Sequence, residues 1–265
     1  MSEKQSLADA SMMPLEEAGK ASEPAVPQFV TQFASMSLHM SDRVRFLNFP
    51  PELPASIEGV FTAHWPTGIQ YKQNYGGSYE FKLRGRPWTG HGSDAITARR
   101  LMCRLLEALY DSGWVLAFAT DISKKPEDKD TLIFRLQNPI PAPRSWAAIS
   151  FSNTDKIRLI DAPDELVQSV VSTYSDMGVV QRHGPYFLEG AYELKLRGRP
   201  WWSSGEETMT ARRWLLILLA VLETHGYTCY ASIDQKAGSA ESGDTDTWHI
   251  CRPQTWTPGL PVFHG

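Results

Sequence analysis

An internal repeat constrains the fold of this chain more than any other feature of its sequence. The segment YEFKLRGRPW at Tyr79–Trp88 returns as YELKLRGRPW at Tyr192–Trp201, and the tetrapeptide TARR at Thr97–Arg100 returns at 210–213. The offset is 113 residues both times, and 19 of the 43 positions from 79 to 121 are identical to their counterparts in an alignment without gaps. Self-similarity at one offset predicts two copies of the same structural unit in tandem.

The similarity extends beyond these motifs and sets the expected domain boundaries. Residues 41–53 align with 154–166 at the same offset, and DTLIFR from Asp130 parallels DTWHICR from Asp246. The Pro-rich stretch between the copies is typical of an extended spacer, while the start of the chain has too few apolar residues to fold. We therefore expect a disordered N-terminal tail (1–30), repeat unit 1 (33–136), a Pro-rich linker (137–145), repeat unit 2 (146–252) and a C-terminal tail (253–265).

Hydrophobic periodicity predicts the elements of one unit. Alternating apolar and charged residues indicate strands at 43–46 and 79–84, and two more strands are expected at 114–120 and 131–136. Apolar residues at helical spacing predict a long helix over about 94–110, and a shorter helix is expected after Pro51. The predicted order is β-β-α-β-α-β-β. Hairpin-length connections favour a mostly antiparallel sheet with helices on one face, so we expect an α+β fold of two pseudo-symmetric tandem units.

Length, charge and cysteine usage exclude several classes of protein. The 265 residues suffice for two domains. The formal net charge of −4 argues against a protein that is basic overall and binds nucleic acid or a membrane surface through that charge. The longest apolar run, Trp214–Leu222, has nine residues, whereas a membrane-spanning helix needs roughly 20. The N-terminus lacks the apolar segment of a secretory signal, and three cysteines without C-x-x-C spacing fit a reducing compartment. We therefore expect a soluble protein of the cytoplasm or nucleus that makes no membrane contact.

Arginines cluster beside tryptophans in the repeated motifs. If the strand end and the following helix start are adjacent, four arginines converge near a helix N-terminus in each unit, which suits a phosphate or a carboxylate. The candidate ligand-binding residues are Arg84, Arg86, Trp88, Arg99 and Arg100 in unit 1, and Arg197, Arg199, Trp201, Arg212 and Arg213 in unit 2. The alternative is structural, because arginines paired with retained acids such as Glu80 and Glu193 would lock turn to strand without a ligand.

The two long helices are not equivalent. Arg104 and Glu107 of the first correspond to Ile217 and Ala220 of the second, so that WLLILLAVL at 214–222 is apolar all round. A two-layer unit buries one side of its helix, and the other side should then be covered by unit 1, by the C-terminal tail or by another chain. The candidate interface residues are Trp214, Ile217 and Val221.

No motif for a named chemistry is present. The histidines do not recur at matching positions, no His/Cys spacing resembles a zinc site, and there is no P-loop, dinucleotide-binding or G-x-S-x-G pattern. We therefore predict no catalytic residue, metal or cofactor. The leading hypothesis is a non-catalytic binding or adaptor protein that presents a surface to a protein partner or to a second copy.

Two alternatives belong to other classes of function. One is an enzyme or sensor of an anionic small molecule, a phosphate or a carboxylate, bound at the Arg/Trp clusters. The other is weak binding of single-stranded nucleic acid along the cationic strand face, which the interleaved acids and the negative net charge disfavour.

Overall fold

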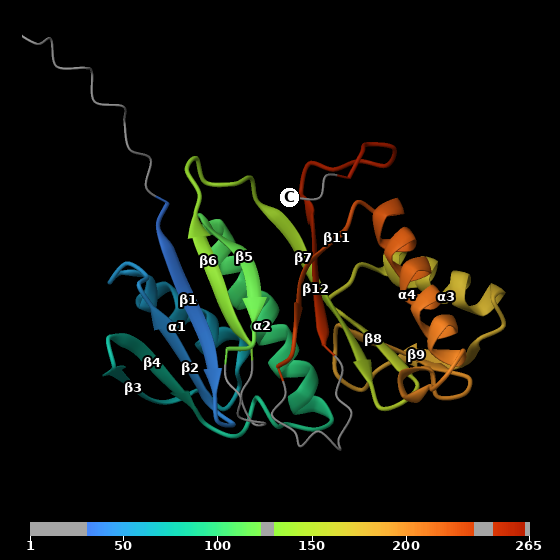
Figure 1. Cartoon of the computed structure of the whole chain (residues 1–265), viewed down its shortest axis with the longest axis horizontal. Coiled ribbons are helices and arrows are strands. Elements are labelled where there is room, and N and C mark those ends of the chain that lie inside the picture. The colour runs from blue at the N-terminus through green and yellow to red at the C-terminus, as the bar shows by residue number, and fades with distance from the viewer. Residues whose placement is uncertain (1–30, 123–129, 236–245, 263–265) are drawn as a thin grey trace, which may run out of the picture. The chain divides into compact units, whose positions relative to one another are not determined.

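The computed structural model describes residues 31–122, 130–235 and 246–262 (Figure 1). Unit 1 forms a six-stranded antiparallel sheet, sheet A, with its strands in the order β3-β4-β2-β1-β6-β5. Two helices, α1 and α2, pack on one face of this sheet. The elements of unit 1 are β1 (Phe33–His39), β2 (Arg43–Leu47), α1 (Leu53–His64), β3 (Ile69–Tyr75), β4 (Ser78–Leu83), α2 (Ser93–Asp111), β5 (Trp114–Thr120) and β6 (Thr131–Leu136).

Unit 2 repeats this arrangement. Its sheet B is antiparallel, and the order β11-β12-β7-β8-β10-β9 places equivalent strands in equivalent positions. The predicted α+β fold of two pseudo-symmetric tandem units is confirmed. The elements of unit 2 are β7 (Arg144–Ser152), β8 (Lys156–Ile160), α3 (Asp164–Asp176), β9 (Val180–Pro185), β10 (Ala191–Leu196), the 3-10 turn η1 (Pro200–Trp202), α4 (Glu207–Thr224), β11 (Thr228–Ile233) and β12 (Thr247–Pro253).

Each unit contains one strand more than predicted. The observed order is β-β-α-β-β-α-β-β, with β3 and β9 as the additional edge strands. Nearly every residue of β3 is exposed, so the strand has no alternation of apolar residues that would reveal it. The turn between β3 and β4 instead specifies this strand. Gly76 and Gly77 both have positive φ, 56° and 81°, as a two-residue hairpin loop requires.

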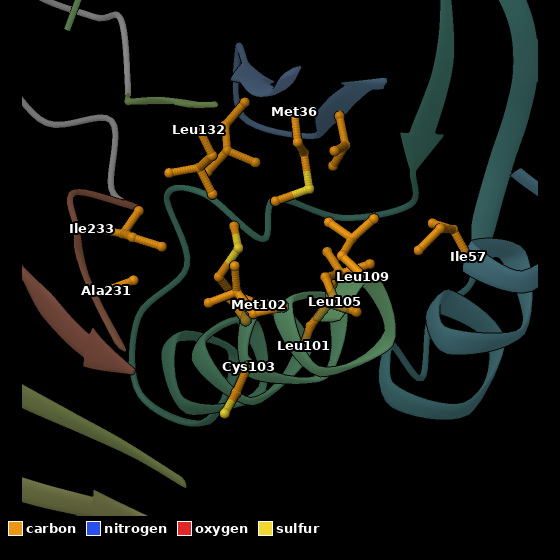
Figure 2. Close-up of a cluster of buried hydrophobic side chains, with 14 of the residues drawn as sticks. Met36, Ile57, Leu101, Met102, Cys103, Leu105, Leu109, Leu132, Ala231 and Ile233 are labelled. Atoms are coloured by element: carbon orange, nitrogen blue, oxygen red, sulfur yellow. The ribbon is translucent and has the colours of Figure 1, made fainter. Parts of the chain in front are cut away.

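The core of unit 1 lies between sheet A and its two helices. We call the face of each sheet that its own helices cover the inner face, and the opposite one the back face. The helix stripe predicted from Ala98 to Leu109 is buried against the inner face of sheet A, where it meets residues such as Met36 and Leu132. Figure 2 shows Leu101, Leu105 and Leu109 directed toward Met36, with Ile57 of α1 beside them.

Helix α2 is also buried on its second side, against unit 2. It packs on β7 and β8, and Figure 1 shows it lying between sheet A and sheet B. Figure 2 shows Cys103 on the side of α2 away from Met36. The residues of unit 2 that join this core from the back face and edge of sheet B are Trp146, Ala148, Ile160, Ala191, Ala231, Ile233 and Cys251. The layers therefore follow as sheet A, α1 and α2, sheet B, and then α3 and α4.

This stacking corrects the expectation for the apolar helix of unit 2. Helix α4 buries Leu218 and Leu222 in a second core against the inner face of sheet B. Unit 1 does not cover the other side of α4. The helices lie on the same side of the sheet in both units, so that α2, and not α4, lies between the two sheets. Leu216 remains 66% exposed on that side and Met209 56%. Despite its apolar composition, neither α4 nor any other helix of the described segments is long and apolar enough to cross a membrane.

The described part of the C-terminal segment packs beside the end of α4. A Cβ at Gly226, just after this helix, would come 2.3 Å from the ring of Trp256. The Trp256 Nε1 donates to the Leu260 carbonyl at 3.2 Å, which closes the segment on itself. The tail thus packs beside the C-terminal end of α4, while Leu216 and Met209 further along the helix remain exposed.

Candidate functional site

The repeated LRGRPW segments form turns that their tryptophans attach to the sheets. Gly85 and Gly198 have φ of 79° and 75°, a region that glycine enters without steric cost. The buried Trp88 donates from Nε1 to the Arg43 carbonyl at 3.0 Å, and Trp201 donates in the same way to Lys156 at 3.0 Å. These two candidate residues therefore serve as structural anchors in equivalent places.

The strand-end arginines do not meet the helix arginines in either unit. Arg84, Arg86, Arg197 and Arg199 are all exposed. Arg197 and Arg199 line a small cavity of about 230 Å³ with Trp214, but Arg212 and Arg213 do not. Those two are exposed on α4, where Arg212 bonds to the Thr208 carbonyl of its own helix. This cavity therefore does not bring the predicted set of four together.

In unit 1 the helix arginines point toward unit 2 instead. The buried Arg99 donates from Nε to the Thr247 hydroxyl at 3.0 Å. Arg100 donates from Nε to both carboxylate oxygens of Asp161, at 2.9 and 3.0 Å, and from Nη2 to the Glu189 carbonyl at 2.6 Å. Arg104 reaches the same Asp161 at 3.1 Å. The arginines of α2 thus hold the two units together.

The retained acids pair with strand residues rather than with the candidate arginines. Glu80 is fully buried on the back face of sheet A, where Arg45 and Gln73 donate to it at 2.7 and 2.9 Å. Burial alone would raise the pKa of Glu80, but these hydrogen bonds and the nearby guanidinium of Arg43 outweigh it and hold the pKa below its ordinary value. Glu193 of sheet B has a lowered pKa for the same reason, with Arg158 as its main donor.

The candidate interface residues lie around the outward side of α4. Ile217 and Val221 line a shallow groove of about 730 Å³ between α3 and α4. Trp214 is half-buried and packs against the unit 2 core, and its carbonyl accepts a hydrogen bond from the Tyr174 hydroxyl at 2.7 Å. The other residues that line the groove are Glu165, Gln168, Ser169, Ser172, Thr173, Ala220, Thr224 and His225.

Equivalent positions of α2 and α4 have opposite environments. Cys103, buried between α2 and sheet B, corresponds to the exposed Leu216. Arg104, which reaches Asp161 on sheet B, corresponds to Ile217 in the groove. The surface that unit 1 uses to bind sheet B is therefore present on unit 2 in a more apolar form. Among residues 31–122, 130–235 and 246–262, nothing binds it. Leu216 and Met209 are not among the predicted interface residues, although they are exposed large hydrophobic residues of α4.

The comparisons with known proteins define the family. A protein-family model matches the chain twice, at residues 32–135 and 145–251, which together are most of its length. The chain belongs to the family that this model defines and carries the family's domain in tandem. Neither the curated proteins nor the solved structures contain a significant match to it.

Proposed function

We propose that this protein is a non-catalytic adaptor that binds a partner protein through the outward side of α3 and α4. The observation that carries the proposal is the contrast between two equivalent helices. The outward side of α2 is buried against sheet B, while Leu216 and Met209 of α4 are more than half exposed. Large apolar side chains gathered on one face, beside a groove, are typical of a protein-binding surface.

The contact between α2 and sheet B indicates the chemistry of the partner. There, apolar residues such as Ala148 and Ile160 pack against the helix, and Asp161 at the end of β8 receives Arg100. Helix α4 keeps the counterpart of Arg100, the exposed Arg213, beside its apolar residues. A partner that fits would present an apolar sheet face with a carboxylate at its margin.

Charge argues for a different protein rather than a second copy. In sheet A, the position equivalent to Asp161 is Asn48, which also has a positive φ but carries no charge. The open face of sheet A therefore lacks the carboxylate that α2 uses to bind sheet B. A second copy docked through sheet A would leave Arg213 without this ion pair.

Affinity capture with matched variants tests the proposal. The Leu216→Glu protein places a charge on the outward side of α4, and Phe187→Glu places one on a similarly exposed apolar residue of the same unit, 75% exposed, in the connection between β9 and β10. Proteins captured by the wild type and by Phe187→Glu, but not by Leu216→Glu, are then purified and titrated against all three. We expect a purified partner whose affinity falls at least tenfold with Leu216→Glu, and also with Arg213→Glu.

Two results would overturn this function. One is a set of purified partners that bind Leu216→Glu as tightly as the wild type. The other is a concentration-dependent dimer in light scattering that Leu216→Glu abolishes, because a second copy would then be the occupant of the surface.

A further inference from the structure

A second candidate site lies in a cleft between the edges of the two sheets. Strand β5 is the edge of sheet A and β11 is the edge of sheet B, and they pack beside each other. The Tyr230 hydroxyl of β11 accepts a hydrogen bond from the Leu116 backbone N–H of β5 at 2.7 Å. The cleft that they flank has a volume of about 670 Å³, within the range of roughly 300–1,000 Å³ usual for small-molecule sites.

The two charged residues that line the cleft are both positive. Two guanidinium groups line it, Arg135 from β6 and Arg144 from the start of β7, and no residue of its lining carries a carboxylate. The rest of the lining is neutral and includes the apolar or aromatic residues Tyr110, Val115, Phe118 and Tyr230, together with the polar residues Gln137 and Ser232. The cleft thus combines aromatic and aliphatic walls with two cations and several hydrogen-bonding groups.

Arg144 differs from the other half-buried arginines of the sheets. Arg45 pairs with Glu80 at 2.7 Å and Arg158 with Glu193 at 2.8 Å. Arg144 instead donates to the Tyr110 hydroxyl at 2.7 Å and to the Cys251 sulfur at 3.5 Å. Neither Arg144 nor Arg135 has an ion pair with any carboxylate in the described segments. A partly buried cation such as Arg144 is normally compensated by a negative charge, and no described residue supplies one to it or to the exposed Arg135 beside it.

We propose that the β5–β11 cleft binds a small organic anion, a carboxylate or a phosphate monoester with an apolar body. The planar guanidinium of Arg144 is held in place by Tyr110 and Cys251, and such a group binds either anion through paired N–H donors. Phe118, Val115 and Tyr230 give the apolar body surfaces to contact. This site is separate from the α3–α4 groove, and its function does not depend on the adaptor role.

Calorimetric titration with four probes tests the site. The probes are 4-phenylbutyrate, phenyl phosphate, the neutral 4-phenylbutanol and inorganic phosphate. We expect saturable binding of at least one of the first two, with the alcohol and inorganic phosphate each at least tenfold weaker. Comparison of the carboxylate with the phosphate ester then identifies the anion.

Three arginine variants locate the binding. Arg135→Gln removes an exposed cation of the cleft and should fold normally, Arg144→Gln removes the more buried one, and Arg86→Gln is an exposed control outside the cleft. We expect Arg135→Gln and Arg144→Gln to lower the affinity for the organic anion roughly tenfold or more, as loss of a charge-assisted hydrogen bond predicts. Arg86→Gln should leave this affinity unchanged. Failure of both organic anions to saturate, or an affinity in Arg135→Gln equal to that in Arg86→Gln, would overturn the proposal. Equal binding of the neutral alcohol would do the same.

Discussion

Arg100 of unit 1 holds both carboxylate oxygens of Asp161 in unit 2, at 2.9 and 3.0 Å from its Nε. Arg104 adds a third hydrogen bond to the same carboxylate. This pairing joins a helix of one repeat to the sheet of the other, because α2 lies between the two sheets. The tandem units thus form a stack whose first helix layer is enclosed and whose second is open.

The Asp161→Asn protein should be less stable because it leaves two arginines without their shared anion. Asparagine keeps the backbone geometry, since Asp161 has φ of 55° and its counterpart Asn48 has φ of 63°. Hydrogen bonds to a charged group contribute about 1.5–3 kcal/mol, so we expect the free energy of unfolding in urea to fall by about 2 kcal/mol. The Asn48→Asp protein, which has no such arginine pair to receive it, is the control. An unchanged unfolding midpoint for Asp161→Asn would mean that the pair does not join the units.

Equivalent substitutions in α2 and α4 should have very different effects on stability. Cys103→Glu would bury a carboxylate between α2 and sheet B without a partner made for it, and we expect a loss of at least about 3 kcal/mol or failure to fold. Leu216→Glu, at the equivalent position of α4, lies on an open surface and should change the free energy of unfolding by less than about 0.5 kcal/mol. Chemical denaturation of both proteins measures the difference. Similar losses in the two would show that both helices are enclosed.

His249 should make stability depend on pH below neutrality. It is fully buried on β12, and neither ring nitrogen has a hydrogen-bond partner among the described residues. Burial, helped by the charge of Arg99, lowers the pKa of His249 to about 3. Because this value lies below the unfolded pKa of about 6.5, the stabilising effect of the neutral ring is fully present above pH 6.5 and is lost as the pH falls toward 3.

The His249→Leu protein isolates this effect. Between pH 7 and pH 5 the wild type should lose about 2 kcal/mol more stability than the variant, at about 1.4 kcal/mol per pH unit below 6.5. At pH 7 the variant should be at least as stable as the wild type, since it removes two buried polar atoms to which no described residue offers a hydrogen bond. Parallel pH profiles of the two proteins would contradict this account of His249.

The sequence predicts the unit but not the way in which the two units pack. Alternation in β2 and the stripe of α2 specify one buried face each, which is enough for a sheet covered by helices. The information on stacking is in β7, where residues 146–151 read WAAISF and every one is buried. A strand that is apolar without alternation is covered on both faces, whereas β1 alternates and leaves the back face of sheet A open.

The candidate sites depend on that packing and so were harder to predict. The repeat marks residues common to both units, such as Arg86 and Arg199, and these are exposed. Asp161 differs from its counterpart Asn48, and Arg144 lies in the segment expected to be a spacer. The apolar surplus of α4 was visible in the sequence, but whether that surface is open or covered depends on the direction in which the units stack.

Thiol labelling at two equivalent positions tests the central claim, that α2 is enclosed and α4 is open. In a Cys229→Ser background, which removes the exposed cysteine, Cys103 and Cys251 are both buried and should react with a maleimide only after unfolding. Introduction of Leu216→Cys into the same background should add one thiol that reacts promptly in the folded protein. Prompt labelling of Cys103, or protection of the new thiol in the isolated protein, would contradict the stacking described here.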